Sequence, residues 1–198
     1  MPEPVTHLLY LHGFRSSPQS AKAQQTKAWM QAHRPEVHWW CPQLPPSPRE
    51  TMDLLREGIA GWPDQRTGVI GSSLGGFYAT AVAEQFGGRV VLLNPAVDPA
   101  RDLARHIGET TAWHSAERFF FRAEFIDELR AISPAALTRP ERYFAIIAKG
   151  DEVLSWTEMC ARYAGCRIKL LDAGDHALSD FDAHLPDVVG LLGLTSSG

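Results

Sequence analysis

Cysteine is scarce in this chain, and its positions do not suggest a disulfide framework. Three cysteines occur among the 198 residues, at Cys41, Cys160 and Cys166. An odd number without a repeated spacing is not the pattern of a small disulfide-stabilised domain. Two cysteines with no histidine near them in sequence also do not make a zinc site. We therefore expect three free, unreactive thiols in a reducing compartment.

An excess of basic residues and a long apolar run are also missing. The chain has 19 Lys and Arg against 23 Asp and Glu, a net charge of −4. Nucleic-acid-binding proteins neutralise phosphates with clustered basic residues, so we expect no nucleic-acid partner. No apolar run approaches the roughly 20 residues that cross a bilayer, and the first residues, MPEPVTHLLYLHGF, do not resemble a signal peptide. We expect a soluble, cytoplasmic protein without a membrane partner.

The composition is that of an ordinary globular domain, with 44% hydrophobic and 21% charged residues. A chain of this length can form one core without metals or disulfides, so we expect a single domain over residues 1–198. Six short apolar runs predict strands. Most are continuous rather than alternating, which is typical of a parallel sheet covered on both faces. They are His7–Leu11, Val37–Cys41, Thr67–Ile70, Arg89–Leu93, Tyr143–Ala148 and Arg167–Leu171.

Helical patterns lie between these strands. Strands that alternate with helices predict an α/β fold, with a mostly parallel sheet of about six strands and helices on both faces. The expected helices are Ser20–His33, Thr51–Ile59, Leu74–Phe86, Thr157–Tyr163 and Ala183–Leu192.

One connection, from Asn94 to Arg142, contains no expected strand and is unusually long. Two helical pieces, Pro99–His106 and Ala123–Ala131, and an aromatic cluster fall within it. Such an insertion, at about residues 98–140, predicts a helical lid over a site. The alternative is a second packing layer that only shields the sheet edge. The aromatic cluster consists of Trp113, Phe119, Phe120 and Phe121.

The sharpest motif is the pentapeptide GSSLG at residues 71–75, between an expected strand and an expected helix. A G-x-S-x-G sequence in this setting is typical of a nucleophile elbow, in which Ser73 makes a sharp turn and the flanking glycines leave room for it. The alternative is a glycine-rich helix start used for close packing or anion binding. A Walker-type phosphate loop would carry a lysine where Phe77 and Tyr78 stand.

A nucleophilic serine needs a base, and later strands of this kind of fold supply it. Two candidates lie in the insertion and one lies in an expected helix. His176 instead follows the last strand in a glycine-containing loop, and sites of open parallel sheets collect at the carboxyl ends of the strands. We therefore favour His176 among His106, His114, His176 and His184.

The orienting acid is expected after the preceding strand. Asp151 is favoured there, with Glu152 as runner-up and Asp175 as a weaker third choice. Asp151 and Glu152 also have the simpler interpretation of a surface charge pair at a helix start. Asp175 is weaker because it is adjacent to His176, and neighbouring residues rarely aim at each other's ring nitrogen.

Two backbone amides are candidates for an oxyanion hole. They are those of Leu74, just after the nucleophile, and Phe14, in the loop after the first strand, where Gly13 permits close approach. We expect His12 to bond this loop. Arg15 either meets an anionic group of a substrate or faces water.

These motifs together resemble the α/β-hydrolases, and more narrowly the small YqiA-like esterases of bacteria. The resemblance rests on LHGFRSSPQSAKA, CPQLPPSP, GSSLGGFYAT, LLNPAVDP and KGDEVLSW, and it extends from about Leu8 to Leu194. It implies a compact hydrolase without the first two strands of the larger fold, with the first strand beside the elbow strand. It also implies Ser73 as nucleophile, Asp151 as acid and His176 as base. Arg15 and the pair Ser155-Trp156 depart from the family pattern.

The expected activity is that of a serine esterase, which hydrolyses short-chain carboxylic esters through an acyl-enzyme without a metal or cofactor. The partner is then a small acyl ester or thioester. A thioesterase or an acyltransferase with the same three residues is the alternative within enzymes. A non-catalytic binding protein of the same fold is the alternative outside them. The expected substrate pocket consists of Arg15, Trp113, Phe119, Phe120 and Phe121.

Overall fold

A six-stranded parallel sheet forms the centre of the molecule. The computed structural model describes residues 3–111 and 118–195, except for the side chains of residues 109–111 and 118–119. The strand order is β2-β1-β3-β4-β7-β8, and every adjacent pair is parallel. The predicted α/β class is confirmed. The strands are β1 His7–Leu11, β2 His38–Trp40, β3 Thr67–Ser72, β4 Arg89–Leu93, β7 Tyr143–Ala148 and β8 Arg167–Leu171.

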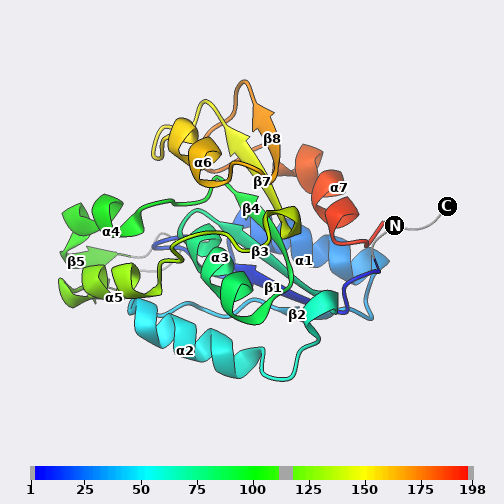
Figure 1. Ribbon diagram of the computed structural model, residues 1–198, viewed down its shortest axis with the longest axis horizontal. Coiled ribbons are helices and arrows are strands. Elements are labelled where there is room, and N and C mark those ends of the chain that lie inside the picture. The colour runs from blue at the N-terminus through cyan, green and yellow to red at the C-terminus, as the bar shows by residue number, and fades with distance from the viewer. Residues whose placement is uncertain (1–2, 112–117, 196–198) are drawn as a thin grey trace.

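Helices cover both faces of this sheet (Figure 1). Helices α1 (Ala21–His33) and α7 (Phe181–Leu191) pack on one face. Helices α2 (Pro48–Gly58), α3 (Leu74–Phe86) and α6 (Trp156–Arg162) pack on the other. Short 3-10 turns, η1 (Asp64–Arg66) and η3 (Pro140–Arg142), lead into β3 and β7.

Strand β1 shows how the two cores form. Successive side chains of a strand point to opposite faces. Leu8 and Tyr10 therefore belong to the core under α1 and α7, whereas Leu9 and Leu11 belong to the core under α2 and α3. All four are fully buried. The continuous apolar run is explained by burial on both faces, as the sequence predicts.

The insertion is not purely helical, so that part of the prediction is wrong. It holds α4 (Pro99–Asp102), the 3-10 turn η2 (Ala104–His106) and α5 (Glu124–Ile132), but also two strands, β5 (Gly108–Thr111) and β6 (Arg118–Phe121). The two strands pair antiparallel. Their threonine and phenylalanine residues favour strands because branched and aromatic side chains fit a pleated surface.

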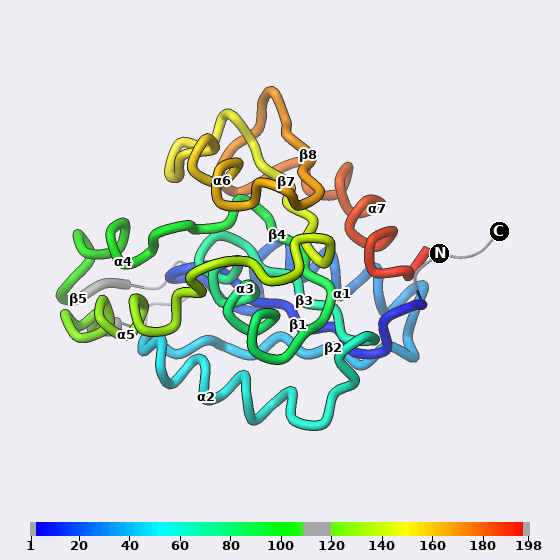
Figure 2. Tube along the Cα trace, in the orientation of Figure 1, coloured from blue at the N-terminus to red at the C-terminus, as the bar shows by residue number. Residues whose placement is uncertain are grey.

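Charged contacts tie the insertion to the rest of the molecule at two places. The Arg101 guanidinium in α4 donates two hydrogen bonds to the Glu158 carboxylate in α6, at 3.0 and 2.8 Å. On the other side, Glu128 in α5 accepts a hydrogen bond from the Ser47 hydroxyl, 2.7 Å away, at the start of α2. The insertion is therefore attached on both flanks. It lies on the opposite side of the molecule from α7 (Figure 2).

Strand β1 lies between β2 and β3. After β2 is placed on one side of β1, the chain crosses to the other side and adds the remaining strands there, so the order of strand addition reverses at β1. Leu11 of β1 stands opposite Gly71 of β3. Open parallel sheets bind ligands outside the carboxyl ends of their strands at such a reversal. The loops after β1 and β3 meet there, which confirms that the first strand lies beside the elbow strand.

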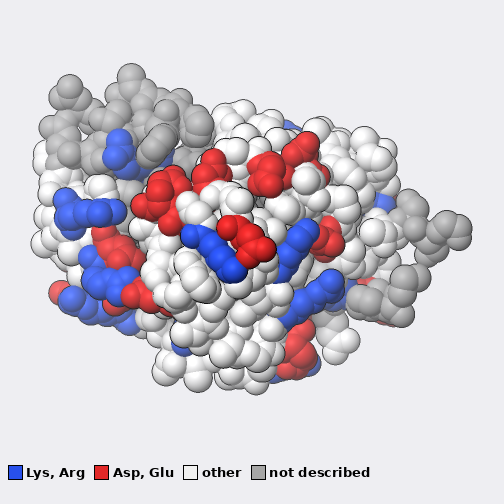
Figure 3. Space-filling model, turned by 90° about the horizontal axis from the view of Figure 1, so that it is seen from above, with Lys and Arg blue, Asp and Glu red and all other residues white. Residues whose placement is uncertain are grey.

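Acidic and basic side chains are mixed on the face that Figure 3 shows, rather than separated by sign. Arg101 with Glu158, and Lys149 with Asp172, form ion pairs between exposed side chains. Within residues 3–111 and 118–195, no helix has the length and apolar character that crossing a bilayer requires.

Candidate active site

The turn from β3 to α3 holds Ser73 in an unusual backbone conformation. Its φ and ψ are 55° and −121°, a region that residues other than glycine rarely occupy. The surrounding backbone fixes this geometry. The Ser73 amide donates to the Leu93 carbonyl at 3.0 Å, and the Ser73 carbonyl accepts from the amides of Gly76 and Ala96 at 2.9 and 3.0 Å. These hydrogen bonds therefore hold the strained backbone of Ser73 in a rigid turn.

The glycines around Ser73 are required by close backbone approach. A Cβ on Gly71 would lie 2.3 Å from the Gly75 carbonyl oxygen, and one on Gly75 would lie 2.0 Å from that of Leu11. Contacts this short do not occur between real atoms, and backbone cannot move aside easily. The predicted reason for the glycines, that side chains there would collide, is confirmed.

The loop that carries Asp151 follows β7 and lies against the loop that follows β8. A Cβ on Gly150 would be 2.1 Å from the Gly174 carbonyl oxygen, so the two loops touch through their glycines. The Asp151 side chain is fully buried. Its Oδ1 accepts hydrogen bonds from the amides of Val153 and Leu154, both at 2.8 Å.

The structure brings Ser73, Asp151 and His176 into one chain of contacts. His176 Nδ1 is 2.7 Å from Asp151 Oδ2, and His176 Nε2 is 3.0 Å from Ser73 Oγ. An ionised carboxylate only accepts hydrogen bonds, so Nδ1 carries the proton and donates it to Asp151. In the neutral imidazole, Nε2 then accepts from the Ser73 hydroxyl. This tautomer is the one that a general base requires.

The other candidate acids lie elsewhere. Glu152 Oε2 accepts a hydrogen bond from the backbone amide of His176 at 3.0 Å, and Asp175 is bonded to the amide and hydroxyl of Ser179. Neither carboxylate is bonded to the imidazole. Glu152 instead holds the main chain of His176, which carries the imidazole.

The other candidate bases are also accounted for where the structure describes them. His184 is buried on α7 beside Lys169, at 3.1 Å. The His106 ring lies 5.2 Å from the ring of Phe14. Burial lowers the pKa of His106, and the charges of Arg105 and Arg15 lower it further. His114 lies outside the described residues.

His12 bonds the loop after β1, as the sequence predicts. Its Nε2 accepts the Leu44 amide at 3.0 Å, so its Nδ1 carries the proton and donates to the Gly13 carbonyl at 3.0 Å. The ring thereby joins two loops. A Cβ on Gly13 would lie 3.3 Å from Ser73 Cβ, which shows how closely this loop approaches the serine.

The two amides expected to form an oxyanion hole belong to this region. Leu74 is the first residue of α3, and the first amides of a helix have no partner within the helix. Phe14 follows Gly13, within a turn that the Ser16 amide closes on the Gly13 carbonyl at 3.2 Å. Their role in binding an oxyanion remains a prediction.

The residues expected to line a substrate pocket do not all lie in one place. The Phe121 ring is buried and packs edge-on against Phe14, with centroids 5.4 Å apart. Arg15 has a φ of 59° in the same loop and lies near His106. Trp113 and the Phe119 side chain lie outside the described residues.

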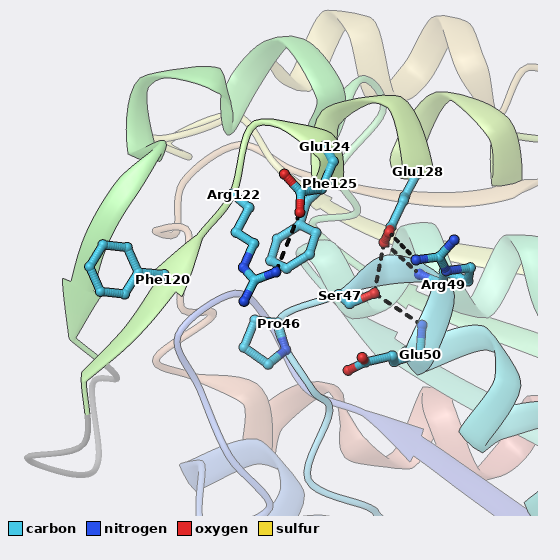
Figure 4. Close-up of a pocket in the computed structure, with 9 residues that line it drawn as sticks. All are labelled: Pro46, Ser47, Arg49, Glu50, Phe120, Arg122, Glu124, Phe125 and Glu128. Carbon is cyan, nitrogen blue, oxygen red and sulfur yellow. Dashed lines mark hydrogen bonds and ion pairs between the residues drawn. The ribbon is translucent and has the colours of Figure 1, made fainter.

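Phe120 is 62% exposed and lines a hollow of about 390 Å³ between the insertion and the start of α2 (Figure 4). Figure 4 shows Glu128 reaching across to Ser47 and Arg49 there. Ser73, Asp151 and His176 do not line this hollow, so a substrate role for Phe120 stays a prediction.

Two side chains that sequence reasoning missed hold the His176 loop. The buried Asn94 amide donates to the carbonyls of Asp175 and His176. The Lys22 ammonium donates to the Ala177 carbonyl. Burial lowers the pKa of Lys22 to about 8, although the carboxylates of Asp175 and Asp151 oppose this. Only the position of Asn94 just after a strand could have drawn attention to it.

Cys41 does not offer a competing nucleophile. All three cysteines are free thiols, and burial raises the pKa of Cys41 to about 12. A thiol with so high a pKa is protonated near neutral pH and reacts poorly. Among the described residues, no group of three or more His, Cys, Asp or Glu side chains is arranged to hold a metal ion.

The fold is that of the α/β-hydrolases. A putative hydrolase from Agrobacterium vitis S4 is 15% identical with a TM-score of 0.74, over 96% of this chain and 91% of that one. Alpha/beta hydrolase domain-containing protein 10 from mouse is 15% identical with a TM-score of 0.66, over 96% and 92%. The esterase domain of a Rhodothermus marinus protein is 22% identical with a TM-score of 0.64, over 95% and 86%.

A family model matches residues 7–193, nearly the whole chain. The chain therefore belongs to the family described as Uncharacterised protein family (UPF0227), the YqiA-like family that its motifs resemble.

Proposed function

We propose that this protein is a serine esterase that hydrolyses short-chain carboxylic esters. The observation that carries the proposal is the continuous contact from Asp151 through His176 to the strained Ser73. Ser73 Oγ attacks the ester carbonyl carbon while His176 Nε2 takes the hydroxyl proton. The tetrahedral intermediate collapses, the bond to the alcohol oxygen breaks, and His176 returns the proton to that oxygen. The acyl group remains on Ser73.

Water completes the cycle by the same steps in reverse order. His176 takes a proton from water, the resulting hydroxide attacks the acyl carbon, and Ser73 leaves with the proton that His176 returns. Asp151 keeps the imidazole in the Nδ1–H tautomer and stabilises the imidazolium. The Phe14 and Leu74 amides donate to the oxyanion in both halves of the reaction.

Structural relatives are consistent with this proposal. One is described as Est1E from Butyrivibrio proteoclasticus and has also been solved with ferulic acid bound, and another belongs to a study of two lipolytic enzymes, LipS and LipT. In this chain, we propose that Arg15 and the aromatic residues of the insertion contact the acyl or alcohol part, with the insertion acting as a lid.

The test is turnover of p-nitrophenyl esters of graded chain length and of the matching acyl thioesters. The proteins are wild type, Ser73→Ala and Ser72→Ala. Ser72 is the adjacent serine at the end of β3 and makes no contact with His176 in the described hydrogen-bond network. We expect hydrolysis by wild type and Ser72→Ala, and a loss of several orders of magnitude in Ser73→Ala.

The same assay separates the alternatives. A marked preference for thioesters would identify a thioesterase, and faster acyl release with added alcohols or amines would identify an acyltransferase. If Ser73→Ala retains wild-type turnover, the proposal is wrong.

A further inference from the structure

We infer that Asn94 is a positioning residue that fixes the orientation of His176. The inference deepens the proposed function and rests on it. Asn94 is the only asparagine in the chain. It follows β4 directly, is fully buried, and touches neither Ser73 nor the imidazole in any described hydrogen bond.

Both polar atoms of the Asn94 side-chain amide form hydrogen bonds. Its Nδ2 donates to the backbone carbonyls of Asp175 and His176, at 3.0 and 3.2 Å. Its Oδ1 accepts from the Ala148 amide at 2.8 Å. A planar amide with both ends occupied holds the loop after β8 at a fixed distance from the end of β7.

This position joins all three parts of the site. The residue before Asn94, Leu93, accepts the Ser73 amide at 3.0 Å, and Ala148 accepts the Asp151 amide at 3.2 Å. The backbone amide of Asn94 donates to the Ile146 carbonyl at 3.0 Å. One buried residue therefore connects the loop that carries His176 to the main chain beside Ser73 and to the main chain beside Asp151.

Two other side chains hold the same loop but are less enclosed. Lys22 donates to the Ala177 carbonyl, and the exposed Glu152 accepts the His176 amide at 3.0 Å. Asn94 is fully buried, so solvent does not compete for its hydrogen bonds in the folded protein. Its removal takes the printed partner from the His176 carbonyl and the Ala148 amide, whereas the Asp175 carbonyl keeps the Leu178 amide at 3.1 Å. We expect the unpaired groups to displace the loop.

The backbone at Asn94 determines which variants are informative. Its φ is 42°, a conformation that asparagine and glycine tolerate better than alanine. Asn94→Gly therefore removes the side chain without added backbone strain. Asn94→Asp keeps an oxygen for the Ala148 amide but replaces the donor with a second oxygen that faces two carbonyls. The two variants remove the hold on the His176 loop by different chemistry.

The control is Thr67→Val. Thr67 is buried at the opposite end of β3, where its hydroxyl donates to the Pro63 carbonyl at 2.8 Å. The substitution removes a buried hydrogen bond of the same kind, far from the carboxyl ends of the strands. It reports what a general loss of stability does to turnover.

The experiment measures kcat and KM for a p-nitrophenyl ester, and the ¹⁵N chemical shifts of the His176 ring, in wild type and all three variants. We expect a kcat loss of about 100-fold in both Asn94 variants with little change in KM, because a displacement of about 1 Å at a catalytic group has that effect. We expect wild type and Thr67→Val to hold the Nδ1–H tautomer, and the Asn94 variants to populate the other one.

The outcomes separate this inference from the proposed function. If wild type hydrolyses esters and both Asn94 variants match Thr67→Val in kcat and in tautomer, the inference is wrong and the function stands. If wild type hydrolyses nothing while its fixed tautomer is lost in both Asn94 variants, the proposed function is wrong and the positioning role stands. If wild type itself has no fixed tautomer, the inference is wrong.

Discussion

Replacement of Asp151 by asparagine tests its proposed role as the acid that orients His176. Asp151 Oδ1 accepts the amides of Val153 and Leu154, both at 2.8 Å. An asparagine NH₂ group cannot face two N–H donors, so the amide oxygen takes the Oδ1 place. The NH₂ group then occupies the place of Oδ2, which is 2.7 Å from His176 Nδ1. Nδ1 must become an acceptor, and the proton moves to Nε2.

An Nε2–H group faces the Ser73 hydroxyl and cannot take its proton. In serine proteases the corresponding change lowers kcat by about 10⁴ while the geometry is kept, which is about 5.5 kcal/mol in the activation free energy. We expect a loss of this size for Asp151→Asn, measured as kcat for a p-nitrophenyl ester near neutral pH. Circular dichroism and the melting temperature show whether the variant is folded.

The matched comparison is Asp175→Asn, which changes the neighbouring candidate acid, whose carboxylate is bonded to Ser179. We expect its kcat to stay within about tenfold of wild type, because this carboxylate does not touch the imidazole. A folded Asp151→Asn variant with near-wild-type kcat would refute the reasoning, and a larger loss in Asp175→Asn would move the acid to Asp175.

Two further predictions concern stability, measured by urea unfolding. Gly75→Ala places a Cβ 2.0 Å from the Leu11 carbonyl oxygen, so we expect a loss of at least about 2 kcal/mol. Gly190→Ala in α7 meets nothing within 4 Å and should gain up to about 1 kcal/mol; equal effects would contradict the packing argument. Burial alone would raise the pKa of Glu84, but hydrogen bonds from Tyr143 and Thr138 outweigh it and hold the pKa below 4.5. Its stabilisation is present above the unfolded-state pKa and is lost as pH falls through the lower folded-state pKa. Wild type should therefore lose more stability than Glu84→Gln between about pH 5 and about pH 3, and parallel curves would exclude this role.

The strands were predictable because burial on both faces leaves continuous apolar runs. Four of the six, such as His7–Leu11, have the observed bounds. Helix α2 begins three residues before its expected start. Ser47 caps it by accepting the Glu50 amide, and Pro48 is its first residue, a signal that the apolar pattern alone does not contain.

The insertion was the least predictable region. Its strands β5 and β6 stabilise each other through pairing, which no local pattern of a single segment reveals. The sequence also does not show which aromatic side chains of β6 are buried: Phe121 is buried, whereas Phe120 is 62% exposed.

The site was predictable where function needs a fixed order along the chain. The expected order of Ser73, Asp151 and His176 matches the three residues that the fold brings into contact. Asn94 was not predictable because its role depends on segments about 54 and 81 residues away in sequence, at Ala148 and Asp175. A side chain that only joins backbone groups of distant loops leaves no local pattern.

The most direct test of the central claim is labelling with a fluorophosphonate, which reacts with activated serines, followed by peptide mapping of the adduct. Wild type and the Ser72→Ala variant should carry the label on Ser73, and the Ser73→Ala variant should carry none. A folded wild-type protein that stays unlabelled, or that is labelled at another residue, would contradict the assignment of Ser73 as an activated nucleophile.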